Sequence, residues 1–79
     1  MATIRYIVND TEMDAAQVAW PSHISQRESG LGYGDRVWIL QSGGSEINSG
    51  VNAVRAVYPY CQVTANRHQA AALAGQIYD

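Results

Sequence analysis

The sequence predicts an α/β domain with a small three-stranded, mainly parallel sheet whose strands alternate with helices in the order β-α-β-α-β-α. Three patterns indicate this class: a stretch rich in β-branched and aromatic residues at 3–8, an apolar run at 37–40, and amphipathic helical spacing at 47–58. Each connection between strands is long enough for a right-handed crossover, which favours parallel neighbours. All 79 residues are expected to form one domain, residues 1–79.

The first strand is expected at Thr3–Val8, where β-branched and aromatic residues predominate. A helix should follow it, because Thr11 and Asp14 have the spacing of a capping pair. Pro21 disfavours a helical conformation at the residue before it, so this helix should end at Trp20.

The segment between this helix and the apolar run is ambiguous in sequence. Residues 22–29 fit either another helical turn or a loop, and the glycine-punctuated residues 30–34 are expected to form a flexible connection. The alternative fold is α+β with a mixed sheet, in which residues 16–20 form a strand instead of the end of the first helix.

Residues 37–41 are expected to form the central strand, because consecutive apolar side chains on both faces suit a strand that is covered on both sides. A helix should then run from Ser45 to about Tyr58 and stop before Pro59. Its apolar stripe consists of Ile47, Val51, Val54 and Tyr58. Gly50 inside this helix costs about 1 kcal/mol relative to alanine, so we expect it to permit close packing on the sheet.

A third strand is expected at residues 60–64, nearer an edge of the sheet because it is less apolar than the central strand. Asn66 and Gln69 have the spacing of a second capping pair. The stripe that follows, Ala70, Leu73 and Ile77, predicts a final helix.

The composition indicates a globular chain with few large apolar side chains to fill its core. Hydrophobic residues make up 47% and charged residues 15% of the sequence, but many of the apolar residues are alanine and phenylalanine is absent. A domain of this size buries only about 60% of the surface that its unfolded chain exposes. We therefore expect marginal stability, to which a homo-oligomer or a larger partner would add buried area.

The charged residues exclude several classes of function. The net charge is −2, and the five basic residues are all arginines, scattered along the chain, so nonspecific nucleic-acid binding is not expected. Without lysine, a Walker-type phosphate loop and Schiff-base chemistry are excluded.

No catalytic set, metal site or cofactor is predicted. Cys61 is the only cysteine in the sequence, and there are two histidines. These three side chains are one fewer than the four ligands of a closed structural zinc site. A thiol nucleophile would need a base such as His68 in reach, whereas a strand cysteine commonly acts as a small buried apolar residue. Acidic residues near the first predicted helix are expected to serve as caps and dipole partners.

One loop is a candidate anion site. Ser42, Gly43, Gly44 and Ser45 follow the apolar strand and precede a helix, whose unpaired N–H groups would face a bound phosphate or carboxylate. Glu46 would place a negative charge beside that anion, and a glycine-rich turn needs no ligand to form.

Trp20, Tyr33 and Arg36 are the candidate interface residues. Trp20 precedes a proline and Tyr33 lies between glycines, so both are expected to be partly exposed in the free monomer. Aromatic and arginine side chains dominate interface hot spots. The partner of this mildly acidic chain should present a neutral to basic surface.

The sequence therefore predicts a small non-enzymatic protein–protein interaction module, such as an adaptor or a virus-encoded inhibitor that blocks a larger protein machine. The alternative is a phosphate- or nucleotide-binding domain that uses the loop at residues 42–45. No stretch has the length of a membrane span and the first residues lack a signal-peptide layout, so we expect a cytoplasmic protein of a bacterium or of a host cell.

Overall fold

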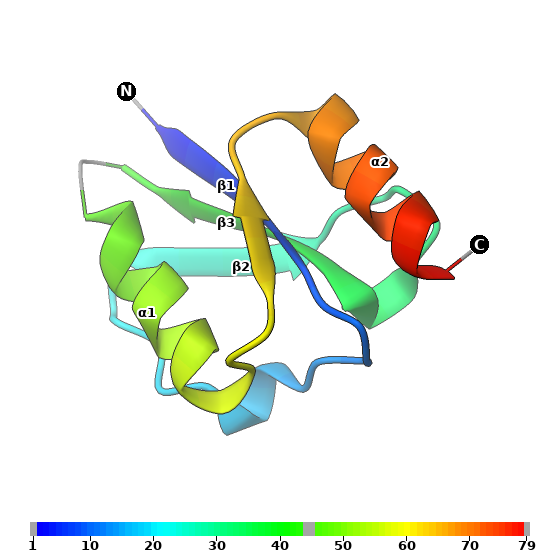
Figure 1. The fold of residues 1–79 in the computed structure, drawn as a ribbon. Helices are drawn as coiled ribbons and strands as arrows, with labels where there is room; N and C mark the ends of the chain where they lie inside the picture. The colour runs from blue at the N-terminus through cyan, green and yellow to red at the C-terminus, as the bar shows by residue number, and fades with distance from the viewer. Residues whose placement is uncertain (1, 44–45, 79) are drawn as a thin grey trace.

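The computed structural model describes residues 2–43 and 46–78 (Figure 1). Along the chain, the described elements are β1 (Thr3–Val8), η1 (Ala15–Gln17), β2 (Ile24–Glu28), η2 (Gly34–Arg36), β3 (Val37–Ser42), α1 (Ile47–Val57), β4 (Gln62–Thr64) and α2 (Arg67–Tyr78). Neither α-helix has the length and hydropathy that a crossing of the bilayer requires, within the part of the chain that is described.

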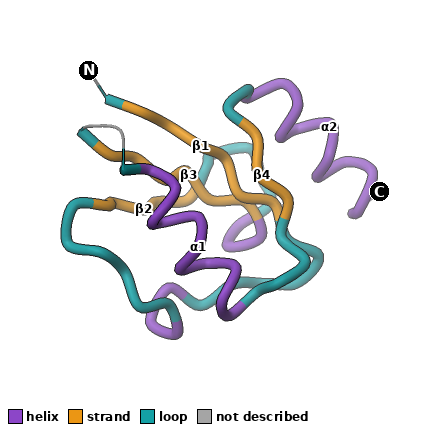
Figure 2. The backbone as a smooth tube through the Cα atoms, turned by 60° about the vertical axis from the view of Figure 1, so that its left-hand side comes forward, coloured by secondary structure: helices purple, strands orange, loops and turns teal. Residues whose placement is uncertain are grey.

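The four strands form one sheet in the order β2-β3-β1-β4 (Figure 2). Every pairing in it is antiparallel. Tyr6 of β1, for example, lies opposite Ile39 on one side and Thr64 on the other. The apolar strand β3 is an interior strand, between β2 and β1, but both neighbours run antiparallel to it, so the prediction that it is the central strand of a parallel sheet is wrong.

The prediction of a three-stranded, mainly parallel sheet is wrong, and the α+β alternative fits better. β2, which the sequence left as loop or helical turn, pairs with β3 and reverses the direction of the chain before β3 begins. The crossover through α1 does join two strands of the same direction, since β3 and β4 both run antiparallel to β1. However, β1 occupies the place between them, so no parallel pair forms.

The added strand is also not the one that the α+β alternative proposed. Residues 16–20 are not a strand; the strand is Ile24–Glu28. The helix expected from Thr11 to Trp20 is reduced to the short turn η1, which Asp14 caps by accepting from the Ala16 N–H at 3.0 Å. Met13 N–H bonds to the Asp35 carbonyl at 3.1 Å, a tertiary bond in place of the helical bonding expected in this segment.

The connection between β2 and β3 depends on glycine. Gly30, Gly32 and Gly34 all have positive φ, at 75°, 92° and 57°, a region that other residues rarely adopt. These conformations fold residues 29–36 back so that β2 and β3 pair as antiparallel neighbours. The prediction of a connection here is thereby confirmed.

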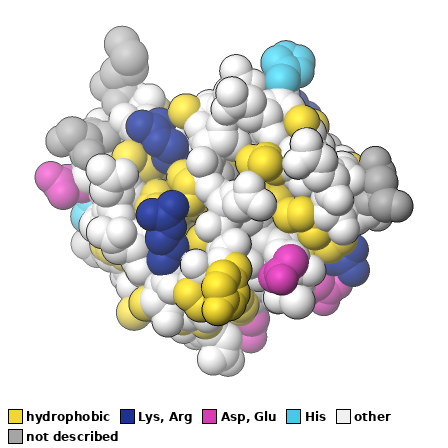
Figure 3. All heavy atoms as spheres, in the orientation of Figure 1, with side chains coloured by type: hydrophobic (Ala, Val, Ile, Leu, Met, Phe, Trp, Pro, Cys, Tyr) yellow, Lys and Arg dark blue, Asp and Glu magenta, His cyan; other side chains and the backbone are white. Residues whose placement is uncertain are grey.

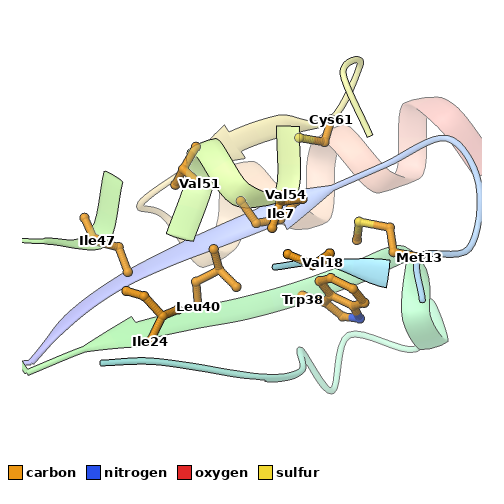
Figure 4. Packing of buried hydrophobic residues seen from close by; sticks show 10 residues of the cluster. All are labelled: Ile7, Met13, Val18, Ile24, Trp38, Leu40, Ile47, Val51, Val54 and Cys61. Atoms are coloured by element: carbon orange, nitrogen blue, oxygen red, sulfur yellow. The ribbon is translucent and has the colours of Figure 1, made fainter. Parts of the chain in front are cut away.

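The helices cover opposite faces of the sheet, as Figure 1 shows, and each face has its own core. The core on the α1 face consists of Ile7, Met13, Val18, Ile24, Trp38, Leu40 and Cys61 together with Ile47, Val51 and Val54 of α1 itself (Figure 4). The core on the α2 face consists of Val8 and Val37 together with Ala70 and Ala74 of α2 itself, with partly buried tyrosine, leucine and isoleucine side chains around them. Of the predicted stripes, Ile47, Val51, Val54 and Ala70 are buried, whereas Tyr58, Leu73 and Ile77 are partly buried and pack at the margins of the two cores. Ala74, which lies outside the predicted stripe, is the other buried residue of α2.

Gly50 allows α1 to approach the edge strand β2. A Cβ at this position would lie 2.9 Å from Cγ2 and 3.1 Å from Cγ1 of Ile24. The expectation of close packing at this glycine is therefore confirmed, with the β2 side chain Ile24 as the neighbour.

Candidate functional site

Trp20 is packed into the core on the α1 face and remains partly exposed. Its ring centroid lies 5.8 Å from that of Trp38, at an interplanar angle of 51°. Its indole Nε1 donates to the Ala15 carbonyl at 2.9 Å, which satisfies the polar end of the side chain. The Trp20 side chain therefore already contacts other residues of the fold.

Tyr33 and Arg36 meet on the opposite face, at the end of α2. The Tyr33 ring lies 5.8 Å from the Tyr78 ring, and the Arg36 guanidinium carbon lies 4.6 Å above the centre of the Tyr78 ring, a cation–π contact. The Tyr78 hydroxyl donates to the carbonyl of Asn9, which is only 2% exposed. The structure therefore brings Tyr33 and Arg36 together but separates both from Trp20.

Tyr78 has a pKa above the ordinary value of a tyrosine. Burial is the largest cause, because removal from water penalises the phenolate; the Arg36 guanidinium lowers the pKa in part, and the carboxylates of Asp10 and Glu12 raise it. The neutral phenol is the form that holds the end of α2 against Asn9.

Tyr78→Phe should therefore change how stability depends on alkaline pH. Because the folded-state pKa lies above the unfolded value of about 10, the contribution of Tyr78 is fully present below about pH 10 and is lost as pH rises through the folded pKa. We expect the free energy of unfolding of the wild type to fall in that window, and the fall to be shallower in Tyr78→Phe. At neutral pH the variant should be less stable by about 1 kcal/mol, since the bond to Asn9 is lost.

Urea unfolding monitored by circular dichroism, at a series of pH values from neutral upward, measures both the loss of stability at neutral pH and its dependence on alkaline pH. The matched control is Tyr60→Phe, which removes a phenol that lies on the surface. Cys61 is present in all three proteins, so its own ionisation cancels in the comparison. Identical alkaline slopes for the wild type and Tyr78→Phe would contradict the assignment.

The turn after α1 carries the most exposed aromatic side chain. Cys61 N–H bonds to the Tyr58 carbonyl at 3.2 Å, which closes a turn with Pro59 and Tyr60 at its two central positions. Tyr60 is 84% exposed and Val57, at the end of α1, is 38% exposed; these are the exposed large hydrophobic residues of the described chain. We call Val57, Pro59 and Tyr60 the Tyr60 turn.

Tyr58 fixes the Tyr60 turn to the rest of the molecule. Its hydroxyl accepts a hydrogen bond from the Asp14 N–H at 2.6 Å, and its ring packs against the α1-side core. The sequence predicts that Tyr60 begins the third strand, but β4 begins at Gln62. The signal that could have located the turn is Pro59, a residue favoured at the first central position of a tight turn.

The candidate anion loop is only partly within the described chain. Gly44 and Ser45, two of the residues predicted to face an anion, lie outside the described residues. Ser42 belongs to β3 and is 2% exposed, paired with Thr3 and Ile24 of the neighbouring strands. Its side chain is therefore part of the packed sheet, whereas Gly43 is exposed.

A serine–histidine contact, which the sequence did not reveal, lies beside this loop. His23 Nε2 is 3.2 Å from Ser49 Oγ and 3.4 Å from the Glu46 carbonyl oxygen. Ser49 Oγ donates to that same carbonyl at 2.7 Å, so the hydroxyl proton points away from the imidazole. A nucleophile–base pair needs the opposite arrangement; the geometry instead joins the start of β2 to the first turn of α1.

Cys61 is buried beneath the Tyr60 turn. Burial raises the pKa of its thiol, and the guanidinium of Arg55 beside it only partly opposes this shift. The thiol is therefore protonated at neutral pH, which makes it a poor nucleophile. Within residues 2–43 and 46–78, histidine, cysteine and acidic side chains do not gather in a group of three that could hold a metal ion.

The chain was compared with known families, proteins and structures. A search of protein-family models, one of curated proteins and one of solved structures each found no match.

Proposed function

We propose that this protein is a non-enzymatic protein–protein interaction module that contacts its partner through the Tyr60 turn. The observation that carries this proposal is the 84% exposure of Tyr60 on a turn that is fixed by two hydrogen bonds, one across the turn and one from Tyr58 to Asp14. Inhibition of a larger protein machine, or an adaptor role, is the kind of function that such a module serves.

A fixed, exposed tyrosine is well suited to binding. Tyrosine is enriched among the hot spots of interfaces because it buries a large area and retains a polar end. The turn is already ordered by Pro59 and by the Cys61–Tyr58 hydrogen bond, so little backbone entropy is lost when a partner covers it. Val57 adds apolar area beside the ring.

The residues predicted from the sequence remain candidates for the edge of this interface or for a second one. Trp20, Tyr33 and Arg36 are partly buried, and each already contacts a side chain of the fold. Their truncation would therefore perturb stability together with binding. Tyr60 offers a cleaner test, since most of its side chain contacts only solvent.

Tyr60→Ala should weaken binding by at least about tenfold, a loss of 1.4 kcal/mol or more, while leaving the thermal midpoint nearly unchanged. The partner would first be identified by placing a photo-reactive phenylalanine analogue at position 60 in the cells that naturally produce the protein. The dissociation constant of the purified pair would then be measured by calorimetry for the wild type and the variant.

Two further variants separate the contribution of the ring from nonspecific effects. Tyr60→Phe keeps the apolar ring and should retain most of the affinity, whereas Asn52→Ala changes an exposed α1 residue outside the Tyr60 turn and should leave it unchanged. Equal affinity of Tyr60→Ala and the wild type would refute the proposal. If phosphate or a nucleotide then raised the thermal midpoint, the loop at residues 42–45 would become the better candidate.

A further inference from the structure

We infer that this protein forms a homodimer, in which the edge strand β2 pairs antiparallel with β2 of a second copy and joins the two sheets into one. The strand lies at one end of the sheet order, with β3 as its only neighbour within the described chain. The pairing uses no residue of the Tyr60 turn, so it is independent of the partner proposed above. It follows from the hydrogen bonds that β2 makes with β3 and from the backbone groups that those bonds leave open.

The pairing of β2 with β3 determines which backbone groups of β2 point outward. Just after β2, Ser29 N–H bonds to the Val37 carbonyl at 3.1 Å. In an antiparallel ladder, pairs that exchange hydrogen bonds alternate with pairs that do not. Arg27 and Ser25, which lie two and four residues before Ser29, therefore bond to β3. The residues between them direct their N–H and C=O groups away from β3: Ile24, Gln26 and Glu28.

Most of these outward groups are open. Ile24 N–H donates to the Pro21 carbonyl at 3.1 Å, which satisfies one of them. The Ile24 carbonyl, and both backbone groups of Gln26 and of Glu28, have no hydrogen-bond partner among residues 2–43 and 46–78. A row of open donors and acceptors along an edge strand is a template on which another strand can pair.

Other parts of the described surface offer a second copy less. The opposite edge strand, β4, has three residues, and Gln62 and Thr64 direct their backbone groups toward β1, so Val63 alone points outward in it. On the face of the molecule that Figure 3 shows, hydrophobic side chains are interrupted by polar and charged ones and form no broad apolar surface. Backbone pairing through β2 is therefore the contact that two copies can share.

A two-fold axis at Gln26 makes β2 complementary to itself. With Gln26 opposite Gln26 of the second copy, Ile24 lies opposite Glu28. The N–H groups of Gln26 and Glu28 in each copy then meet the open carbonyls of Gln26 and Ile24 in the other, and the symmetry repeats every bond. Ser25 lies opposite Arg27, so like charges do not face each other. An axis at Arg27 would instead place two guanidiniums directly opposite, and an axis at Ser25 would carry Glu28 beyond the end of the other strand.

The dependence of amide exchange on protein concentration tests the pairing in the full chain. Between micromolar and millimolar concentration, we expect the average mass in sedimentation equilibrium to rise toward that of a dimer. In parallel, the amide protons of Gln26 and Glu28 should exchange with deuterium several-fold more slowly, as measured by NMR. The outward amide of Val63 on β4 is the control and should exchange at an unchanged rate. A chain that stays monomeric at millimolar concentration, or equal slowing at Val63, would overturn the inference.

Charges introduced at position 26 test whether the two-fold axis lies there. Gln26→Lys and Gln26→Glu each place like charges opposite each other, so each variant should be monomeric, whereas an equimolar mixture of the two should dimerise. Gln26 is only partly buried, so the thermal midpoint of each variant at low concentration should stay close to that of the wild type. Gln62→Lys, at an exposed position of β4, and Tyr60→Ala should both dimerise as the wild type does. Dimers of Gln26→Lys alone, or a mixture that stays monomeric, would overturn the inference and leave the proposed function of Tyr60 untouched.

Discussion

Trp38→Ala should destabilise the protein by about 3–5 kcal/mol, the typical cost of truncating a large core aromatic residue. Trp38 is 2% exposed and is the second residue of β3, where it packs with residues from β1, η1 and α1 in the α1-side core (Figure 4). A domain of this size has a total stability of only about 4–12 kcal/mol. The variant should therefore be largely unfolded or close to it, as measured by urea unfolding with circular dichroism.

Two variants make this prediction quantitative even if Trp38→Ala does not fold. Trp38→Phe should lower the free energy of unfolding by a smaller, measurable amount, because an aromatic ring remains in the core. Trp20→Ala should cost less than Trp38→Ala, since Trp20 is only partly buried. Because the two rings lie 5.8 Å apart, losses at the two sites should not be additive. A stability of Trp38→Ala close to that of the wild type would contradict the packing described.

Gly50→Ala should destabilise the protein by about 1–3 kcal/mol, against the gain of about 1 kcal/mol that helix propensity alone predicts. The added methyl group would lie 2.9 Å from Cγ2 of Ile24, which is a branch close to the β2 backbone and cannot swing away freely. α1 would have to move off β2, and the hydrogen bonding of His23 with Ser49 would be disturbed. Thermal unfolding of the purified variant measures the sign of the effect.

The test of the mechanism is the double variant with Ile24→Ala. Removing the Ile24 side chain should cost stability by itself, but Gly50→Ala added to that background should be neutral or stabilising, because its steric conflict is gone. Gly75→Ala, in α2, is the comparison for a helical glycine on the other face of the sheet. If Gly50→Ala stabilised the wild-type protein, the close approach of α1 to β2 would be refuted.

Elements with a strong local signal could be predicted from the sequence. The stripe from Ile47 to Val54 located α1, because apolar residues at helical spacing can all face one sheet. Asn66 located the start of α2, and its side chain accepts from the N–H groups of His68 and Gln69 at 2.8 and 3.2 Å. The apolar run in β3 indicated an interior strand, because both of its faces are buried.

The candidate site could not be predicted in the same way. Trp20 and Tyr33 are predicted interface residues because a proline and glycines lie next to them in the sequence. The exposure of an aromatic ring, however, depends on which residues from distant parts of the chain pack on it. Trp38 covers Trp20, and Tyr78 covers Tyr33. Tyr60 is exposed because β4 begins two residues later than expected and leaves it on the turn.

The sequence by itself determined α1 and α2, the strands at Thr3–Val8 and at the apolar run, and most of the residues that α1 and α2 bury, since each follows from side-chain spacing within one segment. The third predicted helix, from Thr11 to Trp20, is only the short turn η1. Only the tertiary structure decided the direction of the strands. β2 has one buried apolar residue, Ile24, and otherwise polar or charged ones, so it has no hydrophobic pattern of its own. It is a strand because its backbone pairs with β3. With that pairing, and with β1 lying between β3 and β4, every neighbour in the sheet is antiparallel.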